Sequence, residues 1–422
     1  MPLISWVKNE FHQGKTLISY GAIKATGLGF SFLIPIFLAA FLTPEVLGIY
    51  SLGMMIVYLF NSITVLSSAS PTVICGIEEL TENKTIRRTT ASRIIILLIA
   101  CTTFIATIFL LQDQIISFTK LTRSQAYFLI MVFTGLTISS FIRCILISLN
   151  KRIVESIFQF TTSFISLTYI ILIHFWGGIT LERIFPIFLI SPLISTGLLI
   201  SKKEYQKFLP LSYSKDNFKK ILNYTRWMIL GGTAVYFLNW GDNIILRKFS
   251  TMEDIGVYNL SYQFFKGMIM IFHIIAGYFL PFIAQNIDDK ILIRNYLVNK
   301  RSKLFLSGIL FAGCLFMVMP HFVEIAYKGQ YQDSVLVFRI LLAGGLCSLF
   351  SMFYDPIFTS LKKFHVIQSI TAFAVIVNLT LDYILVSHIG FIGAAIATSF
   401  SYFLMTILKI IYFRKHCKPL II

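Results

Sequence analysis

One face of the long apolar segment 255–284 carries side chains that could bind an anion. At spacings of four, three, four, three and four residues it presents Asn259, Gln263, Lys266, Met270, His273 and Gly277, the periodicity of an α-helix. Lys266 lies too far from either end of the segment for its side chain to reach a polar boundary easily. We predict that Lys266, Gln263 and Asn259 bind substrate. The alternative is that Lys266 pairs with a neighbouring Asp for packing specificity.

Two other cations interrupt apolar segments and are also predicted to bind substrate. Lys24 shares a helical face with Tyr20, Gly27 and Ser31, and Arg143 lies near the end of segment 125–148. Each lies close enough to one end of its segment to reach the headgroup region instead, so an interfacial role is the alternative for both.

Carboxylates and amides form two clusters that could hold a coupling cation through their oxygen atoms. "NWGDNIILRKF" places Asn239, Asp242 and Asn243 on one helical face, and "NLTLDY" places Asn378 four residues before Asp382. We predict ion-coupling roles for Asp242, Asn243 and Asp382, and also for His273, because an imidazole can gain or lose a proton near neutral pH. Hydrogen bonding between helices explains the clusters and His273 equally well. For Asp382, an ion pair with Arg339, at similar height on the preceding helix, is the expected structural alternative.

No metal or cofactor site is predicted. The six cysteines, at 75, 101, 144, 314, 347 and 417, lack CxxC or metal-ligand spacing and are expected to pack as small hydrophobic residues. "GKT" at 14–16 resembles the end of a phosphate-binding loop, but the glycine-rich start of that loop and the strand before it are missing.

The elements that position these residues must be membrane helices. Of 422 residues, 56% are hydrophobic and only 13% are charged, which excludes an ordinary soluble protein. The unbroken apolar runs do not alternate as barrel strands do. Each is long enough to cross about 30 Å of hydrocarbon as a helix. We expect twelve transmembrane helices: 17–42, 46–70, 94–112, 125–148, 154–175, 184–201, 227–247, 255–284, 304–324, 334–360, 364–387 and 390–413.

The net charge of +17 reflects membrane topology and not nucleic-acid binding. With a cytoplasmic N-terminus, segments on the inside hold 25 Lys and Arg residues and segments on the outside hold six. This asymmetry follows the positive-inside rule and predicts that both termini are cytoplasmic. Anionic membrane lipids are the natural partners of the basic segments. The first apolar run is too long for a cleaved signal peptide, so we expect it to be retained.

The sequence contains an internal repeat. "FLTPEVLGIYSL" at 41–52 and "FSTMEDIGVYNL" at 249–260 share six of twelve residues, and "ILISLNK" at 145–151 corresponds to "IFTSLKK" at 357–363. The offsets of 208 and 212 residues predict two homologous six-helix bundles in parallel orientation, around a central cavity that rocking opens to either side. We assign 1–201 to the first bundle, 202–226 to a basic cytoplasmic linker, and 227–422 to the second bundle with a short cytoplasmic tail.

These features resemble the multidrug/oligosaccharidyl-lipid/polysaccharide exporter superfamily. The resemblance rests on the twelve helices in two halves, the connectors Gly48 to Tyr50 and Gly256 to Tyr258, the helix that carries Asp242, and "NLTLDYILVSHIGFIGAAIATSFSYFL" at 378–404. Within the superfamily the chain looks most like the bacterial O-antigen (Wzx-type) lipid-linked oligosaccharide flippase. Related peptidoglycan-precursor flippases usually have fourteen helices, two more than we predict.

The resemblance implies a flippase that moves an undecaprenyl-pyrophosphate-linked oligosaccharide, an O-antigen or capsule repeat unit, from the cytoplasmic to the periplasmic leaflet of a bacterial inner membrane. It also implies coupling to a proton or sodium ion, with a polysaccharide polymerase and a chain-length regulator as partners. Lys266 would then face a solvated cavity and contact pyrophosphate or acidic sugars. Two alternatives stay open. A multidrug exporter of the same superfamily needs a cavity lined mainly by carboxylates, which hold cationic drugs. A membrane-embedded polymerase or glycosyltransferase needs a large external loop. We expect a transporter and not an enzyme.

Overall fold

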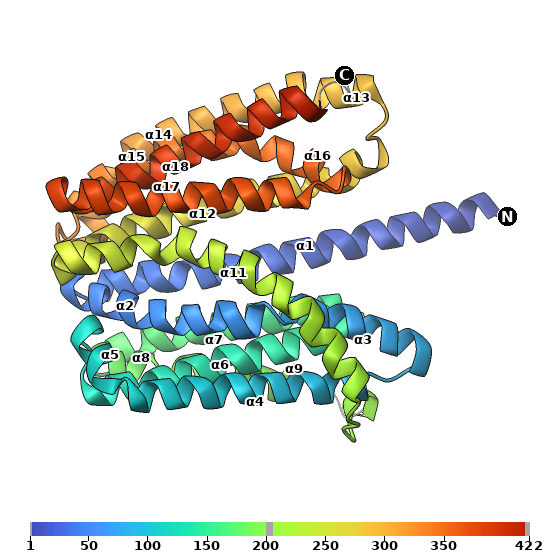
Figure 1. The fold of residues 1–422 in the computed structure, drawn as a ribbon, viewed down its shortest axis with the longest axis horizontal. Helices are drawn as coiled ribbons and strands as arrows, with labels where there is room; N and C mark the ends of the chain where they lie inside the picture. The colour runs from blue at the N-terminus through green and yellow to red at the C-terminus, as the bar shows by residue number, and fades with distance from the viewer. Residues whose placement is uncertain (1, 200–205, 418–422) are drawn as a thin grey trace. The chain divides into compact units, whose positions relative to one another are not determined.

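The computed structural model describes residues 2–199 and 206–417, with the backbone alone given for 2–20, 273, 281 and 364. Every secondary-structure element in this part of the chain is a helix (Figure 1). The predicted all-α architecture is therefore confirmed.

The first part of the chain forms long helices joined by short turns. α2 and α3 are separated by one π-helical segment, η1, so that residues 44–83 run as a nearly continuous rod. The helices up to residue 199 are α1 (Pro2–Phe41), α2 (Pro44–Phe60), η1 (Asn61–Leu66), α3 (Ala69–Asn83), α4 (Arg87–Leu110), α5 (Gln112–Thr119), α6 (Arg123–Ser148), α7 (Arg152–Phe175), α8 (Leu181–Ile184) and α9 (Ile187–Leu199).

The second part of the chain also forms long helices joined by short turns. Its helices are α11 (Lys215–Phe249), α12 (Met252–Gln285), α13 (Lys290–Asn295), η2 (Tyr296–Lys300), α14 (Arg301–Tyr327), α15 (Asp333–Ser351), η3 (Met352–Tyr354), α16 (Asp355–Ser360), α17 (Phe364–Ile389), α18 (Phe391–Tyr412) and η4 (Phe413–Cys417).

The chain divides into two compact units. Unit 1 comprises Met1–Phe41 and Leu52–Thr233, and unit 2 comprises Leu42–Ser51 and Ala234–Ile422. Within unit 1, α1 packs along α7, where Gly27 lets the backbones approach: a Cβ at this position would lie 3.0 Å from the Phe160 backbone. Within unit 2, α18 packs against both α15 and α17. The assignment of 202–226 as a linker between homologous bundles stays a prediction.

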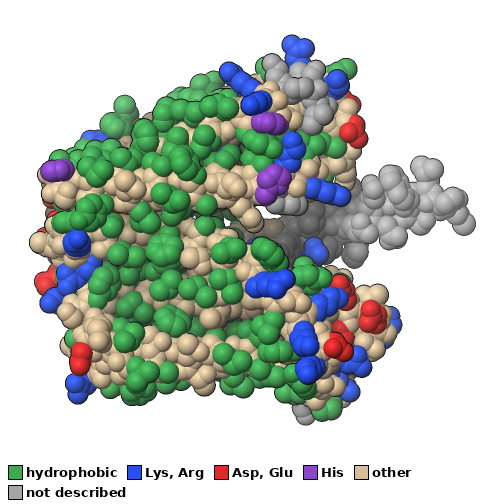
Figure 2. Space-filling model, viewed as in Figure 1, with side chains coloured by type: hydrophobic (Ala, Val, Ile, Leu, Met, Phe, Trp, Pro, Cys, Tyr) green, Lys and Arg blue, Asp and Glu red, His purple; other side chains and the backbone are tan. Residues whose placement is uncertain are grey.

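Eleven helices among the described residues are long and apolar enough to cross a membrane. The expected seventh span, 227–247, lies within α11 and is not among these eleven. Its polar group of Asn239, Asp242 and Asn243 lowers the mean hydropathy of that stretch. Large hydrophobic side chains such as Leu98 and Phe109 are exposed. On the face drawn in Figure 2, hydrophobic side chains cover the middle of the helices, and most charged ones lie toward the helix ends.

Residues of the repeated connector lie at the starts of α2 and α12, where they form capping contacts. Thr251 and Asp254 form a capping box at the start of α12, with N–H···O distances of 2.9 and 3.1 Å. Thr43 lies in the equivalent place before α2, where its hydroxyl is 3.4 Å from the backbone nitrogen of Val46.

The repeated glycines lie where the two helix starts touch. A Cβ on Gly48 would lie 2.0 Å from the Met252 carbonyl oxygen, and a Cβ on Gly256 would lie 1.8 Å from the Pro44 carbonyl oxygen. Neither glycine can therefore be replaced without moving backbone. The repeat in the sequence corresponds to a reciprocal contact in the structure.

Candidate functional site

Five buried side chains from four helices of unit 2 form one polar cluster around Asp242 on α11. The hydroxyl of Tyr258 on α12 donates to Asp242 Oδ2, and the hydroxyl of Thr398 on α18 donates to the same oxygen at 2.8 Å. The Asn378 amide on α17 donates to Asp242 Oδ1 at 3.3 Å and to Asp382 Oδ2 at 2.8 Å. The two Asp residues, which the sequence presents in separate clusters, thus share one site.

This Asp242 cluster is rich in oxygen atoms and in negative charge. Asp242 and Asp382 are 2% and 0% exposed, and the donors found to their carboxylates are two hydroxyls and one amide. Asn378 Oδ1 and Asp382 Oδ1 are buried and have no hydrogen-bond partner in the described part of the chain. Two buried carboxylates repel each other when both are ionised, so a proton or a bound cation would stabilise the cluster.

Two of the predicted residues bond to each other beside this cluster. Asn259 Nδ2 donates to Asn243 Oδ1 at 2.6 Å and to the Ile255 carbonyl at 2.8 Å. Asn259 and Asn243 are 3% and 1% exposed. Asn259 therefore connects α12 to α11. Its role in substrate binding stays a prediction.

Lys266 lines a pocket of about 420 Å³ within unit 2. Its ammonium nitrogen lies 4.4 Å from the centroid of the Trp240 ring and 4.7 Å from that of Tyr262, which are cation–π distances. Asn239 and Tyr402 line the same pocket. The Lys266 amine thus lies beside polar groups of this unit 2 pocket, where an anionic ligand could contact it.

A partly buried ion pair borders the unit 2 pocket. Lys409 Nζ lies 2.7 Å from Asp355 Oδ1 and 3.0 Å from Oδ2, and the Lys409 side chain is only 6% exposed. Both residues line the pocket together with Lys266. The lining of the pocket thus includes two basic side chains and one acidic side chain.

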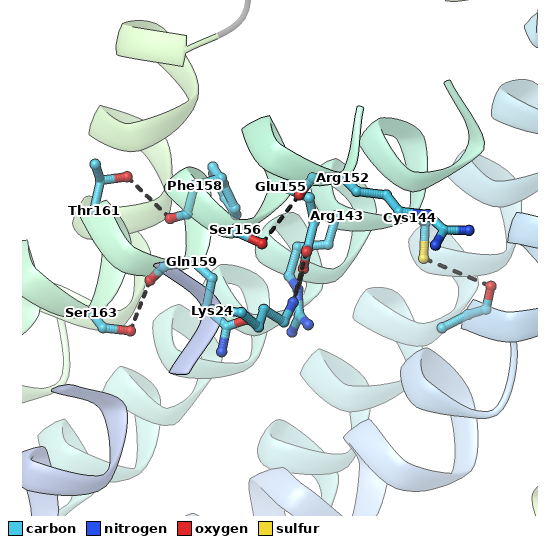
Figure 3. A network of polar contacts seen from close by, with 11 residues as sticks. Lys24, Arg143, Cys144, Arg152, Glu155, Ser156, Phe158, Gln159, Thr161 and Ser163 are labelled. Carbon is cyan, nitrogen blue, oxygen red and sulfur yellow. Dashed lines mark hydrogen bonds and ion pairs between the residues drawn. The ribbon is translucent and has the colours of Figure 1, made fainter. Parts of the chain in front are cut away.

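Unit 1 contains a second network of two cations and one carboxylate (Figure 3). Lys24 Nζ lies 2.5 and 2.7 Å from the two oxygens of Glu155, and Arg143 Nε lies 2.7 Å from Oε1. Glu155 is 1% exposed, whereas the side chains of Lys24 and Arg143 are 20% and 39% exposed. The structure thus brings together two predicted substrate-binding residues from α1 and α6 through a Glu on α7.

The expected ion pair between Arg339 and Asp382 is wrong. Arg339 donates to the Phe316 carbonyl at 3.2 Å and lies over the Phe316 ring at 4.1 Å, whereas Asp382 belongs to the Asp242 cluster. Equal height on consecutive helices does not fix which way the two side chains point. Gln263 is half-buried on α12 and is not among the residues that line the unit 2 pocket. The His273 side chain lies outside the described part of the structure.

The sequence alone does not reveal the roles of Glu155, Lys409 and Thr398. Glu155 and Lys409 lie within about a turn of a predicted helix end, which favours an interfacial position, yet both are buried in ion pairs. The available signal for Glu155 was the presence of two cations, Lys24 and Arg143, that need an anion. Thr398 gave no signal, since a single hydroxyl in an apolar helix is common.

A family model described as "Polysaccharide biosynthesis protein" matches residues 14–287. Among curated proteins, the chain is 22% identical over 202 residues to a probable low-salt glycan biosynthesis flippase, Agl15, of Haloferax volcanii. That match covers 47% of this chain and 43% of the relative. The chain therefore spans less than half the length of this relative.

Two solved structures share the fold over almost the whole chain. The first is a multidrug resistance MATE family transporter of the MOP superfamily in an inward-facing conformation, with TM-score 0.79, 14% identity, and coverage of 96% of this chain and 98% of the other. The second is the lipid II flippase MurJ in an inward closed conformation, with TM-score 0.77, 12% identity, and coverage of 94% and 88%. At these identities the likeness establishes a MOP-superfamily fold.

Proposed function

Because the chain belongs to the polysaccharide biosynthesis protein family and has the fold of MOP-superfamily membrane proteins, we propose that it is a flippase for a lipid-linked glycan. The similarity to a glycan biosynthesis flippase of an archaeon and to the fold of a lipid II flippase supports this assignment. Family and fold are those of transporters and not of enzymes, as the sequence predicts.

The observation that carries the proposal is the unit 2 pocket with Lys266. A lipid-linked glycan has a polar, anionic head and an apolar tail, and only the head needs a path through the hydrocarbon. Lys266 presents an ammonium group to a pocket of unit 2 whose lining is mostly apolar, and it lies over two aromatic rings. Such a charge is expensive at this depth unless it has a function, so we assign it to the pyrophosphate or acidic sugars of the head.

For the architecture we propose twelve spanning helices in two homologous bundles, with α11 supplying the seventh. Alternating access would come from rocking of the bundles around a central cavity. The repeated helix starts at Gly48 and Gly256 support the duplication. In the cell, the negative cytoplasm favours export of an anion by about 2.3 kcal/mol per charge per 100 mV.

For coupling we propose that the Asp242 cluster binds a proton or a sodium ion. Two carboxylates, an amide and two hydroxyls supply the hard oxygen ligands that such ions prefer. Their burial, with no Lys or Arg among the donors found to the carboxylates, supports an exchangeable positive charge at this place.

The finer biological role we propose is translocation of an O-antigen or capsule repeat unit on undecaprenyl pyrophosphate, across a bacterial inner membrane. A polysaccharide polymerase and a chain-length regulator would then act on the product. A multidrug exporter of the same fold is the competing function. The lining of the unit 2 pocket argues against it, because a cationic drug needs carboxylates and the one acidic side chain there already pairs with Lys409.

Complementation of a flippase-null strain tests the proposal. Expression of the chain should restore glycan on the cell surface, whereas a Lys266→Glu variant present at the same membrane level should not. Restored drug resistance without restored surface glycan would contradict the flippase assignment and support the exporter.

A further inference from the structure

Unit 1 contains a second pocket, of about 450 Å³, lined by η1 and α3 on one side and by α6 on the other. Its polar lining consists of Asn61, Ser70, Ser139, Ser140 and Arg143, with Cys144 beside them. None of the lining residues that the structure describes is acidic. The lining therefore offers hydroxyl, amide and guanidinium donors without a competing carboxylate.

Arg143 is held in a position that leaves its two terminal amino groups available to a ligand. Its Nε bonds to Glu155 at 2.7 Å, and this bond fixes the plane of the guanidinium group. The side chain is 39% exposed and lines the pocket, so the two terminal amino groups can present a fork to a ligand. Such a fork matches the oxygen atoms of a phosphate or carboxylate.

The Glu155 network does not neutralise Arg143. Lys24 binds both oxygens of the same carboxylate, at 2.5 and 2.7 Å. Two cations against one carboxylate leave one positive charge beside the pocket. That charge is available to an anionic ligand.

A second positive charge lies directly behind the pocket wall. Arg93 on α4 is 0% exposed, and it contacts two hydroxyls, a carbonyl and the thiol of Cys144. It donates to Ser140 Oγ and to the Val65 carbonyl, each at 3.0 Å, and also to the Ser68 hydroxyl. Because Ser140 accepts from Arg93, its own hydroxyl proton can be donated either to Cys144 Sγ or to a ligand. A buried Arg without a carboxylate is costly unless an anion lies nearby.

The local backbone also departs from regular helix here. Asn61 and Val65 belong to η1, the π-helical turn of the rod, and such turns are frequent at functional sites. Asn61 is 6% exposed and lines the pocket. This turn thus supplies both a pocket residue and the carbonyl that positions Arg93.

We propose that this unit 1 pocket binds a phosphate or pyrophosphate oxyanion, with Arg143 as its direct ligand and Arg93 as a positioning residue that acts through Ser140. This assignment deepens the proposed function and rests on it for the source of the ligand. The same chemistry fits the pyrophosphate of a polyprenyl-linked glycan and the headgroup phosphate of an ordinary anionic phospholipid.

The site is tested by titrating inorganic pyrophosphate into the purified full-length chain in nanodiscs of neutral lipid. Arg143→Gln should weaken binding about tenfold, as expected for loss of one charged hydrogen-bonded group. Arg143→Lys should lie in between, because it keeps the charge and loses the fork. The control is Lys220→Gln, which removes an exposed cation of unit 1 that pairs with Glu78 at 2.6 Å and does not line the pocket; it should bind like wild type.

A second variant covers the case in which Arg143→Gln fails to fold. Ser139→Leu fills the pocket without touching the Glu155 network and should also weaken pyrophosphate binding about tenfold, since it removes a donor and blocks the space. Wild-type affinity in Ser139→Leu, or in folded Arg143→Gln, would show that pyrophosphate binds elsewhere and would overturn the site.

Competition separates the two sources of the oxyanion. Polyprenyl pyrophosphate should displace inorganic pyrophosphate, whereas phosphatidylglycerol at the same fraction of the bilayer should not. Displacement by phosphatidylglycerol alone would overturn the substrate assignment and make this a phospholipid site. The flippase proposal is judged separately by complementation: wild-type surface glycan with no pyrophosphate binding refutes only the site, and pyrophosphate binding without surface glycan refutes only the flippase.

Discussion

Asp242 receives hydrogen bonds from three other helices, which makes it the residue on which the unit 2 cluster depends. Tyr258, Thr398 and Asn378 all donate to it, and Asn378 links it to Asp382. A hydrogen-bond network built only for packing would work equally well with neutral side chains. An ion site needs the negative charge, and this difference can be measured.

Asp382→Asn is expected to remove ion coupling while keeping the shape of the cluster. Transport by this variant in vesicles should lose its dependence on the sodium or proton gradient. Thr398→Val should raise the ion concentration for half-maximal transport about tenfold, because one hydrogen-bonding ligand is lost. Both are measured by glycan translocation at varied gradients, with protein levels matched. An Asp382→Asn chain that still responds to the gradient as wild type would contradict the ion-site assignment.

Substitutions of Lys266 test the unit 2 pocket. Lys266→Arg should keep part of the transport activity, because the charge and the stacking on Trp240 are retained. Lys266→Ala should lower delivery about tenfold or more, and Lys266→Glu should have the largest effect, since it repels the anionic head. Surface glycan is measured in the flippase-null strain beside an immunoblot of membranes. Wild-type delivery by a normally expressed Lys266→Ala chain would remove Lys266 from the substrate site.

At the scale of elements, the contact between the starts of α2 and α12 depends on two glycines. Gly48 and Gly256 let carbonyl oxygens of the opposite helix come within 2.0 and 1.8 Å of where a Cβ would lie. Gly277, further along α12, has nothing within 4 Å of its Cβ position. The same helix thus supplies the test residue and its control.

Gly256→Ala is expected to destabilise the chain by about 1–3 kcal/mol, the usual penalty for overpacking a tight contact. Gly277→Ala should be neutral or stabilising by up to about 1 kcal/mol, because alanine is the better helix former. Thermal unfolding followed by size-exclusion chromatography in detergent measures the difference. Equal melting temperatures for the two variants would show that the helix crossing tolerates a side chain.

The helices can be predicted from the sequence because the length of an apolar run and its helical periodicity are local properties. The apolar runs appear as helices, and the repeated Thr and Gly are explained by capping and close approach. The partners of polar residues are not local, since side-chain direction depends on the packing of distant helices. This explains why Asp242 and Asp382 fall in separate sequence clusters and why the Arg339–Asp382 pair is wrong. Helix α11 is longer and more polar than the span expected within it.

At the scale of the whole molecule, the positive-inside count predicts where the basic segments lie. Residues 202–226 carry seven Lys and Arg, and in the described part of this segment Lys220 pairs with Glu78 on α3. We predict that this segment and both termini are cytoplasmic.

A single cysteine in place of Lys215, in a chain without its six native cysteines, tests this topology. An impermeant thiol reagent should leave Cys-substituted chains unlabelled in intact cells and should label them after the membrane is opened. Labelling in intact cells would reverse the topology and, with it, the direction of transport that we infer.

We propose that this chain by itself moves a lipid-linked glycan across a bilayer. The most direct measurement is the rate at which a polyprenyl-pyrophosphate oligosaccharide, placed on the inner leaflet of proteoliposomes that contain the purified chain, becomes accessible to an external lectin. We predict a rate well above that of protein-free vesicles and of vesicles with Lys266→Glu, increased by an ion gradient. A rate equal to that of protein-free vesicles, with the chain folded and the gradient intact, would contradict the assignment as a flippase.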